Sequence, residues 1–155
     1  MLAIHVFNRQ SKLVILEKSV LPLVSSVLQV ENQHFDEASV SFVEIDEISA
    51  LHKKFFNDPS PTDCISFPID GKEEKGYRVL GDVFVCPEIA IRYTNECGGN
   101  PYKETTLYVV HGVLHLLGYN DIKEEERSLM RKAEKRNMIQ LHKQGLYLSS
   151  TSHVS

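Results

Sequence analysis

The segment His111–Asp121, which reads HGVLHLLGYND, places two histidines four residues apart inside an otherwise apolar run. Apolar residues at helical spacing flank both histidines, so the segment predicts a helix that packs against the core. Positions i and i+4 of a helix bring their Cβ atoms to about 5–6 Å, which lets two imidazoles converge on one metal ion. The segment therefore predicts both a buried helix and a metal site on its surface.

Gly118 follows the last apolar residue of this helix and is predicted to end it. The turn would fold residues 119–121 back toward the histidines and offer Asp121 as a third ligand. Asp121 has an alternative role, because Glu124 follows three residues later and the pair fits a helix N-cap with a capping box. The spacing alone favours the cap, although one carboxylate can serve both purposes.

Two histidines on an apolar helix face have a simpler explanation, in which each is a core residue with its own hydrogen bond. A buried imidazole nitrogen without a partner costs about 1–3 kcal/mol, and a shared metal ion would satisfy both rings. The spacing alone does not decide between these readings. Position 112 is glycine where the zinc peptidase motif HExxH has its glutamate base, so the predicted chemistry is metal-assisted hydrolysis of another kind.

With 155 residues, 42% of them hydrophobic, the chain is long enough for one domain with a core and shows no sign of two. A formal net charge of −4 argues against general nucleic-acid binding over the whole surface and leaves room for a local basic strip. Cys64, Cys86 and Cys97 form no CxxC pair, which is typical of reduced cytosolic thiols. No signal peptide or membrane span is evident, so we expect a cytoplasmic protein without membrane contacts.

Hydrophobic periodicity and turn residues divide the chain into strands and helices. We expect strands over residues 2–7, 39–45, 64–68 and 78–86. We expect helices over residues 13–30, 46–56, 87–97, 101–118 and 122–145. The fold class is therefore α+β, a single domain in which a mixed sheet of about four strands packs with about five helices.

Local signals refine these elements. Pro22 predicts a kink or a split in the first helix, and Asp46 and Asn100 are expected to cap the helices that follow them. The last two strands are expected to form an antiparallel pair joined by a mobile loop over residues 70–76. Residues 148–155 have little to bury and are expected to form a disordered tail after a domain of residues 1–147.

Three motifs resemble the YbeY family of bacterial rRNA maturation factors, described as metal-dependent endoribonucleases. HGVLHLLGYND is similar to the family signature H-G-x-L-H-L-x-G-Y-D-H. Residues 61–68 (PTDCISFP) are similar to its P-T-D-V-L-S-F-P segment, and residues 80–83 (LGDV) to its L-G-D-I segment. The motifs occur in the family's order and cover most of the ordered chain.

The resemblance implies a single-strand-specific, zinc-dependent endoribonuclease that acts in maturation of the small-subunit rRNA 3′ end and in ribosome quality control. Its implied partners are ribosomal RNA and the small subunit, while the oligomeric state is not indicated. His111 and His115 match the family's first two histidines and are expected to serve catalysis and to bind one zinc ion. The third histidine falls on Asp121 and the preceding aspartate on Asn120, so the third ligand would be a carboxylate, which zinc accepts.

A second departure lies upstream, where the family pattern N-x-x-Y-R corresponds to HKKFF at residues 52–56. The family arginine, associated with RNA binding or catalysis, would be Phe56. Lys53, Lys54 or Arg78 could supply the charge, although each also fits a solvated surface residue. This loss favours an alternative function, a ribosome-assembly factor with a structural metal and little or no nuclease activity. A metallohydrolase of small molecules or peptides is a third reading, disfavoured by Gly112.

Other polar residues have less specific patterns. Thr62, Asp63, Ser66 and Asp82 are expected to line the cleft, while turn and strand-cap roles explain them equally well. The predicted helix 122–145 mixes lysine and arginine with glutamate, as solvated helices do. A basic stripe within that helix could still follow a phosphate backbone.

Overall fold

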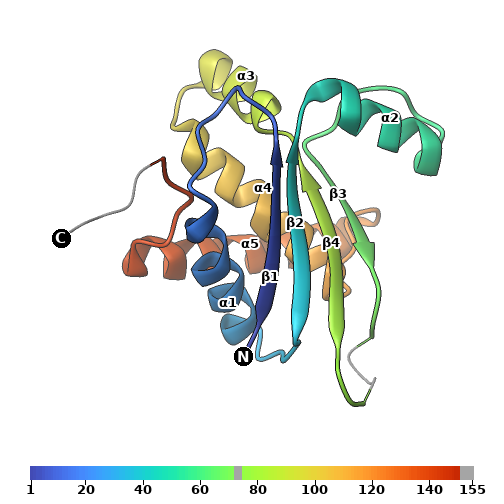
Figure 1. The fold of residues 1–155 in the computed structure, drawn as a ribbon, viewed down its shortest axis with the longest axis vertical. Helices are drawn as coiled ribbons and strands as arrows, with labels where there is room; N and C mark the ends of the chain where they lie inside the picture. The colour runs from blue at the N-terminus through green and yellow to red at the C-terminus, as the bar shows by residue number, and fades with distance from the viewer. Residues whose placement is uncertain (72–74, 151–155) are drawn as a thin grey trace.

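One mixed sheet organises the chain, of which the computed structural model describes residues 1–71 and 75–150. Its strand order is β1-β2-β4-β3, with bounds β1 Ala3–Arg9, β2 Glu37–Val43, β3 Cys64–Pro68 and β4 Val79–Val85. The pairs β1–β2 and β2–β4 are parallel, and β3 runs antiparallel to β4. The predicted α+β sheet and its antiparallel pair are confirmed (Figure 1).

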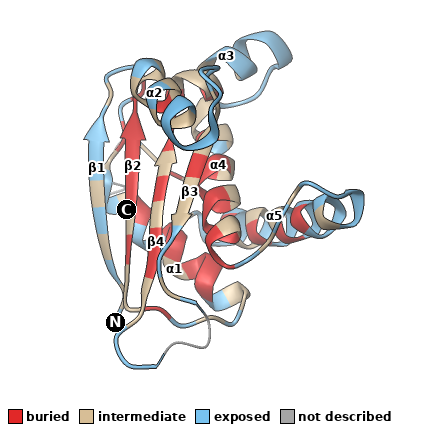
Figure 2. Ribbon diagram, turned by 90° about the vertical axis from the view of Figure 1, so that its right-hand side faces the viewer, coloured by how far each residue is buried: buried red, intermediate tan, exposed pale blue. Residues whose placement is uncertain are grey.

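The helices lie behind the sheet and at one end of it (Figure 1). They are α1 Val20–Val30, α2 Ile45–Phe56, α3 Pro87–Cys97, α4 Pro101–Leu116 and α5 Glu124–Gln144, with a short 3-10 turn at Glu17–Ser19. Helix α4 packs directly on β3 and β4 and contacts α1, α3 and α5 as well. Figure 2 shows that buried residues concentrate in β2, β4 and α4, so α4 is the central helix.

The first helix begins later than the periodicity predicts. Leu13 and Ile15 are buried on a non-helical segment, and α1 starts at Val20. Pro22 therefore lies in the first turn, where its missing N–H is not needed for an intrahelical bond. The expected helix over 13–30 with a kink or split at Pro22 was wrong, because α1 begins at Val20, just before the proline, and does not run through it from residue 13.

Of the two predicted N-cap residues, Asn100 was confirmed and Asp46 was wrong. Helix α2 begins at Ile45 with extended Glu44 as its N-cap, so the expected cap Asp46 lies inside the first turn. A carboxylate there still interacts favourably with the helix N-terminus. Asn100 caps α4 as expected, since its side chain accepts a 2.8 Å hydrogen bond from the Tyr102 N–H.

The chain returns to the core after α5. Leu148 is only 2% exposed, and its N–H donates to Thr106 Oγ1 at 3.0 Å. The Ser149 carbonyl accepts from the Leu16 N–H at 2.7 Å. A disordered tail from residue 148 was therefore wrong for 148–150, because one apolar side chain finds a place in the core. Residues 72–74 and 151–155 lie outside the described residues, so the mobile loop and the rest of the tail stay predictions.

The helices of residues 1–71 and 75–150 include none with both the length and the apolar character needed to cross a membrane.

Helix α4 approaches the sheet so closely that two positions exclude a side chain. A Cβ atom built on Gly112 would lie 2.5 Å from Val83 Cγ1. A Cβ atom on Gly81, in β4, would meet the Phe67 carbonyl oxygen of β3 first and would also lie 2.9 Å from Leu116 Cδ2, and Gly81 has a φ of +144°. The missing side chain of Gly112 therefore sets the distance between α4 and the sheet, while Gly81 is needed chiefly beside the neighbouring strand.

Replacing Gly112 by alanine is expected to lower the free energy of unfolding by about 1–3 kcal/mol, because the added methyl overpacks the interface. Urea denaturation measures the effect. Gly71→Ala is the matched control, since a Cβ there meets nothing within 4 Å. Equal stability of Gly112→Ala and Gly71→Ala would show that the helix can move away at no cost.

Candidate metal centre

His111, His115 and Asp121 converge at the end of α4. The two Nε2 atoms are 3.0 Å apart, and Asp121 Oδ2 lies 3.5 Å from that of His111 and 3.4 Å from that of His115. Ligands that surround zinc tetrahedrally at about 2.0–2.1 Å stand about 3.3 Å from one another. The three side chains thus fit one ion of this bond length and form a candidate metal site.

A glycine turn brings Asp121 back to the histidines. Gly118 has a φ of +103°, and its N–H donates to the His115 carbonyl at 3.0 Å. The Tyr119 N–H donates to the Leu114 carbonyl at 3.1 Å, which completes the pair of bonds of a Schellman turn. The predicted stop at Gly118 is confirmed, with the last helical residue at Leu116.

Asp121 does not cap α5. The helix begins at Glu124, later than predicted, and Lys123 is its N-cap residue. The Lys123 N–H donates to Glu126 Oε1 at 2.9 Å, so Glu126 fills the role expected of Glu124. The capping box of Asp121 with Glu124 was wrong, because the turn after Gly118 aims Asp121 at the histidines.

Both imidazoles are held by their second nitrogen. His115 Nδ1 lies 2.8 Å from the Tyr119 carbonyl oxygen, which can only accept, so Nδ1 carries the proton. His111 Nδ1 lies 2.5 Å from Glu134 Oε2, which as a carboxylate also accepts. Both rings are therefore turned so that Nε2 points toward the third side chain, the orientation that metal ligation through Nε2 requires.

Glu134 is a site residue that the sequence pattern did not reveal. It stands beside Ala133 at the edge of the buried stripe of α5, and that stripe is Met130, Ala133, Asn137 and Leu141. An acidic residue bordering an apolar stripe was the available signal. Burial disfavours the imidazolium of His111, but the hydrogen bond and charge of Glu134, with the charges of Asp63 and Asp121, raise its pKa above the ordinary value.

The three side chains line an open pocket of about 440 Å³. Its other lining residues are His52, Phe56, Thr62, Asp63, Cys64, Ile65, Ser66, Pro68 and Asn120.

Three of the expected cleft residues, Thr62, Asp63 and Ser66, therefore lie where predicted, and Asp82 does not line this pocket. Ser66 Oγ also donates to the Gly112 carbonyl at 2.8 Å, which ties β3 to α4 beside the histidines.

The position of the expected arginine is part of the pocket. Phe56 lines it with its ring 5.6 Å from that of His52. Lys53 and Lys54 are exposed on the same helix and do not line the pocket. Arg78 stacks on Phe35, with its guanidinium carbon 4.3 Å from the ring centroid. The charge of the family arginine is thus not replaced inside this pocket by any of the expected candidates.

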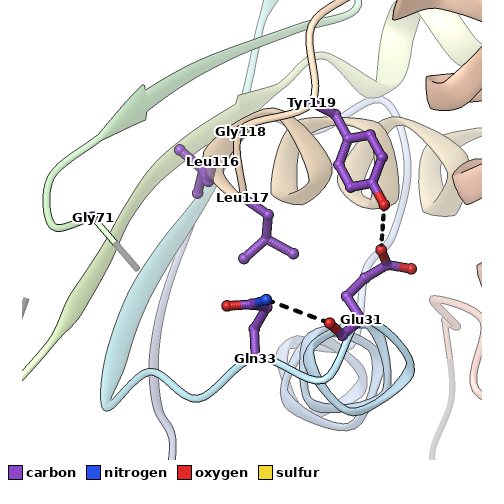
Figure 3. Close-up of a pocket in the computed structure, with 7 residues that line it drawn as sticks. All are labelled: Glu31, Gln33, Gly71, Leu116, Leu117, Gly118 and Tyr119. Atoms are coloured by element: carbon purple, nitrogen blue, oxygen red, sulfur yellow. Dashed lines mark hydrogen bonds between the residues drawn. The ribbon is translucent and has the colours of Figure 1, made fainter. Parts of the chain in front are cut away.

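A second hollow, of about 530 Å³, lies behind the glycine turn (Figure 3). At its rim the Glu31 carboxylate, 6% exposed, accepts a 2.7 Å hydrogen bond from the Tyr119 hydroxyl. Arg136 donates two hydrogen bonds to the same carboxylate, at 2.9 and 2.8 Å, and Asn137 donates a third at 2.9 Å. This network fastens Tyr119, whose carbonyl orients His115.

Burial alone would raise the pKa of the Glu31 carboxyl group. The hydrogen bonds from Arg136, Tyr119 and Asn137, with the charge of Arg136, outweigh burial and lower it. Glu31 is therefore held as a carboxylate.

Comparisons with known proteins agree over nearly the whole chain. The family model described as "Endoribonuclease YbeY" matches residues 5–142. The chain is 45% identical over 145 residues to Endoribonuclease YbeY of Protochlamydia amoebophila, covering 94% of this chain and 97% of that protein. It is 37% identical over 155 residues to Endoribonuclease YbeY of Chlamydia pneumoniae, covering 95% and 96%.

A solved structure has the same fold. The solution structure of TM1509 from Thermotoga maritima matches with a TM-score of 0.63 and 24% identity, covering 92% of this chain and 91% of that one. This likeness supports the arrangement of the sheet and helices described above.

Glu134→Gln is expected to weaken metal affinity about 10- to 100-fold, because the neutral amide oxygen accepts the His111 Nδ1 proton more weakly than a carboxylate does and no longer raises the basicity of the ring. Competition with a chromogenic chelator measures the affinity. Glu125→Gln, an exposed change on the same helix, is the control. If both variants bind metal like the unmodified protein, Glu134 has no part in the site.

Glu31→Gln is expected to lower the free energy of unfolding at neutral pH by about 1–3 kcal/mol, since Arg136 loses its charged partner. Because the pKa of Glu31 is lowered by folding, its stabilisation is present above the ordinary value of 4.5 and is lost as the pH falls through the folded value. Urea titrations at neutral and acid pH should therefore show the two proteins converging in acid. A difference that stays constant with pH would contradict this assignment.

Proposed function

The chain belongs to the YbeY endoribonuclease family, and from this premise we propose that it is a zinc-dependent endoribonuclease specific for single-stranded RNA. His111, His115 and Asp121 would hold one zinc ion, the two histidines being the catalytic residues. The observation that carries the proposal is the triangle of ligand atoms, 3.0 to 3.5 Å on each side, on the wall of an open pocket.

The donor set suits hydrolysis of a phosphodiester. A zinc ion, when bound, polarises a phosphate oxygen and activates water. Tyr119 and Glu134 accept the Nδ1 protons of the two imidazoles and so hold both rings with Nε2 toward Asp121. The three ligand residues line an open pocket, which gives an RNA strand access to them.

The aromatic wall of the pocket supports a single-stranded substrate. Phe56 is 56% exposed and lines the pocket that contains the three ligand atoms. Unstacked bases bind to exposed aromatic rings, whereas the bases of a duplex are not available for such contacts. A phenylalanine here offers stacking where the family pattern has an arginine.

We place this activity in the cytoplasm, in maturation of the small-subunit rRNA 3′ end and in ribosome quality control, with ribosomal RNA and the small subunit as partners. The family membership supports this assignment. The matched residues 5–142 lie within the single domain expected over residues 1–147, which the packing of Leu148 extends by a few residues.

An assembly factor with a structural metal and little nuclease activity is the second candidate function. The observation in its favour is Phe56, because the family arginine would have provided a charge in the pocket. A structural metal would leave binding to the small subunit intact without cleavage of RNA.

His111→Ala is expected to lose bound zinc and to reduce cleavage of an unstructured RNA more than about 100-fold, with unchanged folding. Elemental analysis measures the zinc, and gel electrophoresis of matched single-stranded and duplex RNA measures the cleavage. His34→Ala, an exposed histidine far along the chain from the site, is the control and should behave like the unmodified protein.

Two results would overturn the proposal. Zinc binding by the unmodified protein without any RNA cleavage would favour the assembly factor. Full cleavage by metal-free His111→Ala protein would remove the metal site from the reaction.

A further inference from the structure

Helix α5 carries a row of exposed cations, Arg127, Arg131 and Lys135, which we name the basic row. Resting on the proposed function, we propose that this row binds the phosphate backbone of the RNA and leads it to the metal centre. The row shares a helix with Glu134, which contacts His111. The basic row and the residue that supports His111 are thus on one helix.

Helical spacing relates the basic row to Glu134. Arg127, Arg131 and Glu134 stand at i, i+4 and i+7, which is one face of a helix, and Lys135 stands about 100° round the helix from Glu134. Glu134 contacts His111, while Arg136 on the opposite flank reaches Glu31. The row therefore begins beside the residue that supports His111 and runs toward the N-terminus of α5.

The cations of this flank are free to bind a ligand. Within residues 1–71 and 75–150, no hydrogen bond or ion pair engages the side chains of Arg131, Lys132 or Lys135. Arg127 donates from Nη1 to the Ile122 carbonyl at 2.6 Å and keeps its charge. By contrast, the guanidinium groups of Arg9, Arg92 and Arg136 are each paired with a glutamate.

A hollow of about 600 Å³ lies along the same flank, lined by the basic row, Lys132, Ser128 and Glu124. Helix α5 extends away from the sheet, and its first two turns are exposed almost throughout (Figure 2). The hollow is therefore accessible along its length. Among the lining residues that the structure describes, the one acidic side chain is Glu124, at the far end.

The spacing of the row suits a nucleic-acid strand. Four residues of a helix rise about 6 Å, so the three cations span about 12 Å. A stretch of this length can contact more than one phosphate of a strand. A row of positive charge along a hollow is how proteins follow a strand without reading its sequence.

The negative charge of the metal pocket explains why RNA binding requires cations nearby. Its described lining residues include no lysine or arginine, while Asp63 and Asp121 add negative charge. The chain as a whole has a formal net charge of −4. A polyanion that approaches this pocket must be neutralised beside it, and the basic row offers unpaired cations on a helix that builds the site.

The test compares two charge-reversed proteins as zinc holoenzymes. One is Arg131→Glu with Lys135→Glu; the matched control is Lys12→Glu with Lys18→Glu, two exposed cations near β1, at the other edge of the sheet from β3. Cleavage of a short unstructured oligoribonucleotide is followed over a series of salt concentrations. Zinc content and thermal unfolding verify that both proteins are intact.

The basic-row variant is expected to show a 10- to 100-fold rise in KM with little change in kcat. Its plot of log kcat/KM against log salt should be shallower by about 0.7 for each phosphate that the variant no longer binds. The control should match the unmodified protein in all three quantities. The salt slope is decisive, because a merely structural role would not change it.

Equal KM values and salt slopes in the basic-row variant and the control would overturn the proposal. An acidic protein segment would then replace RNA as the partner of the basic row. A fall in kcat alone would also overturn it. Failure of the unmodified holoenzyme to cleave any RNA would instead refute the proposed function, so the two failures are distinguishable.

Discussion

The close contact between helix α4 and the sheet is the constraint on which the site depends. Gly112 stands between the helix axis and Val83, and the missing side chain allows the helix to lie directly on β4. His111 is the adjacent residue, so the distance between helix and sheet sets how far its ring stands from β3. Ser66 fixes the same position from the strand by its hydrogen bond to the Gly112 carbonyl. The glycine that replaces the glutamate of HExxH peptidases is thus explained by packing, and the space that a base would need is filled by Val83.

Three other elements complete the site around helix α4. The Schellman turn at Gly118 returns Asp121 to the histidines, helix α5 supplies Glu134, and Glu31 at the end of α1 holds Tyr119. Each imidazole is consequently oriented by a separate hydrogen bond, His111 by Glu134 and His115 by the Tyr119 carbonyl. Ligands positioned this way lose little freedom when they bind an ion, which is the physical content of preorganisation.

The features that could be predicted from the sequence are those that depend on residues nearby in the chain. The histidine spacing, Gly118 and the cap Asn100 depend on neighbours within a few residues, and they were found from the sequence. Glu134 and Glu31 act across long separations, and nothing near them in sequence says which partner they meet. The start of α1 and the burial of Leu148 were missed for the same reason, because both are decided by tertiary packing that overrides local propensity. The role of Asp121 was open to two interpretations, and its distances of 3.5 and 3.4 Å to the two histidines, with Lys123 as the N-cap of α5, favour the metal site over the cap.

The two departures from the family pattern act on the charge of the pocket in the same direction. Asp121 adds a negative charge where the family has a neutral imidazole, and Phe56 removes the positive charge of an arginine. With Asp63 and Glu134 near His111, the side chains of the pocket by themselves attract a cation and repel a phosphate. The two positive charges of an ion held by the three ligands would offset most of this negative charge, so in the proposed function metal binding would favour RNA binding, and RNA would favour metal binding by the same coupling free energy. Specificity for a strand would then come from groups outside the ligand set, which in our proposals are the ring of Phe56 and the cations of α5.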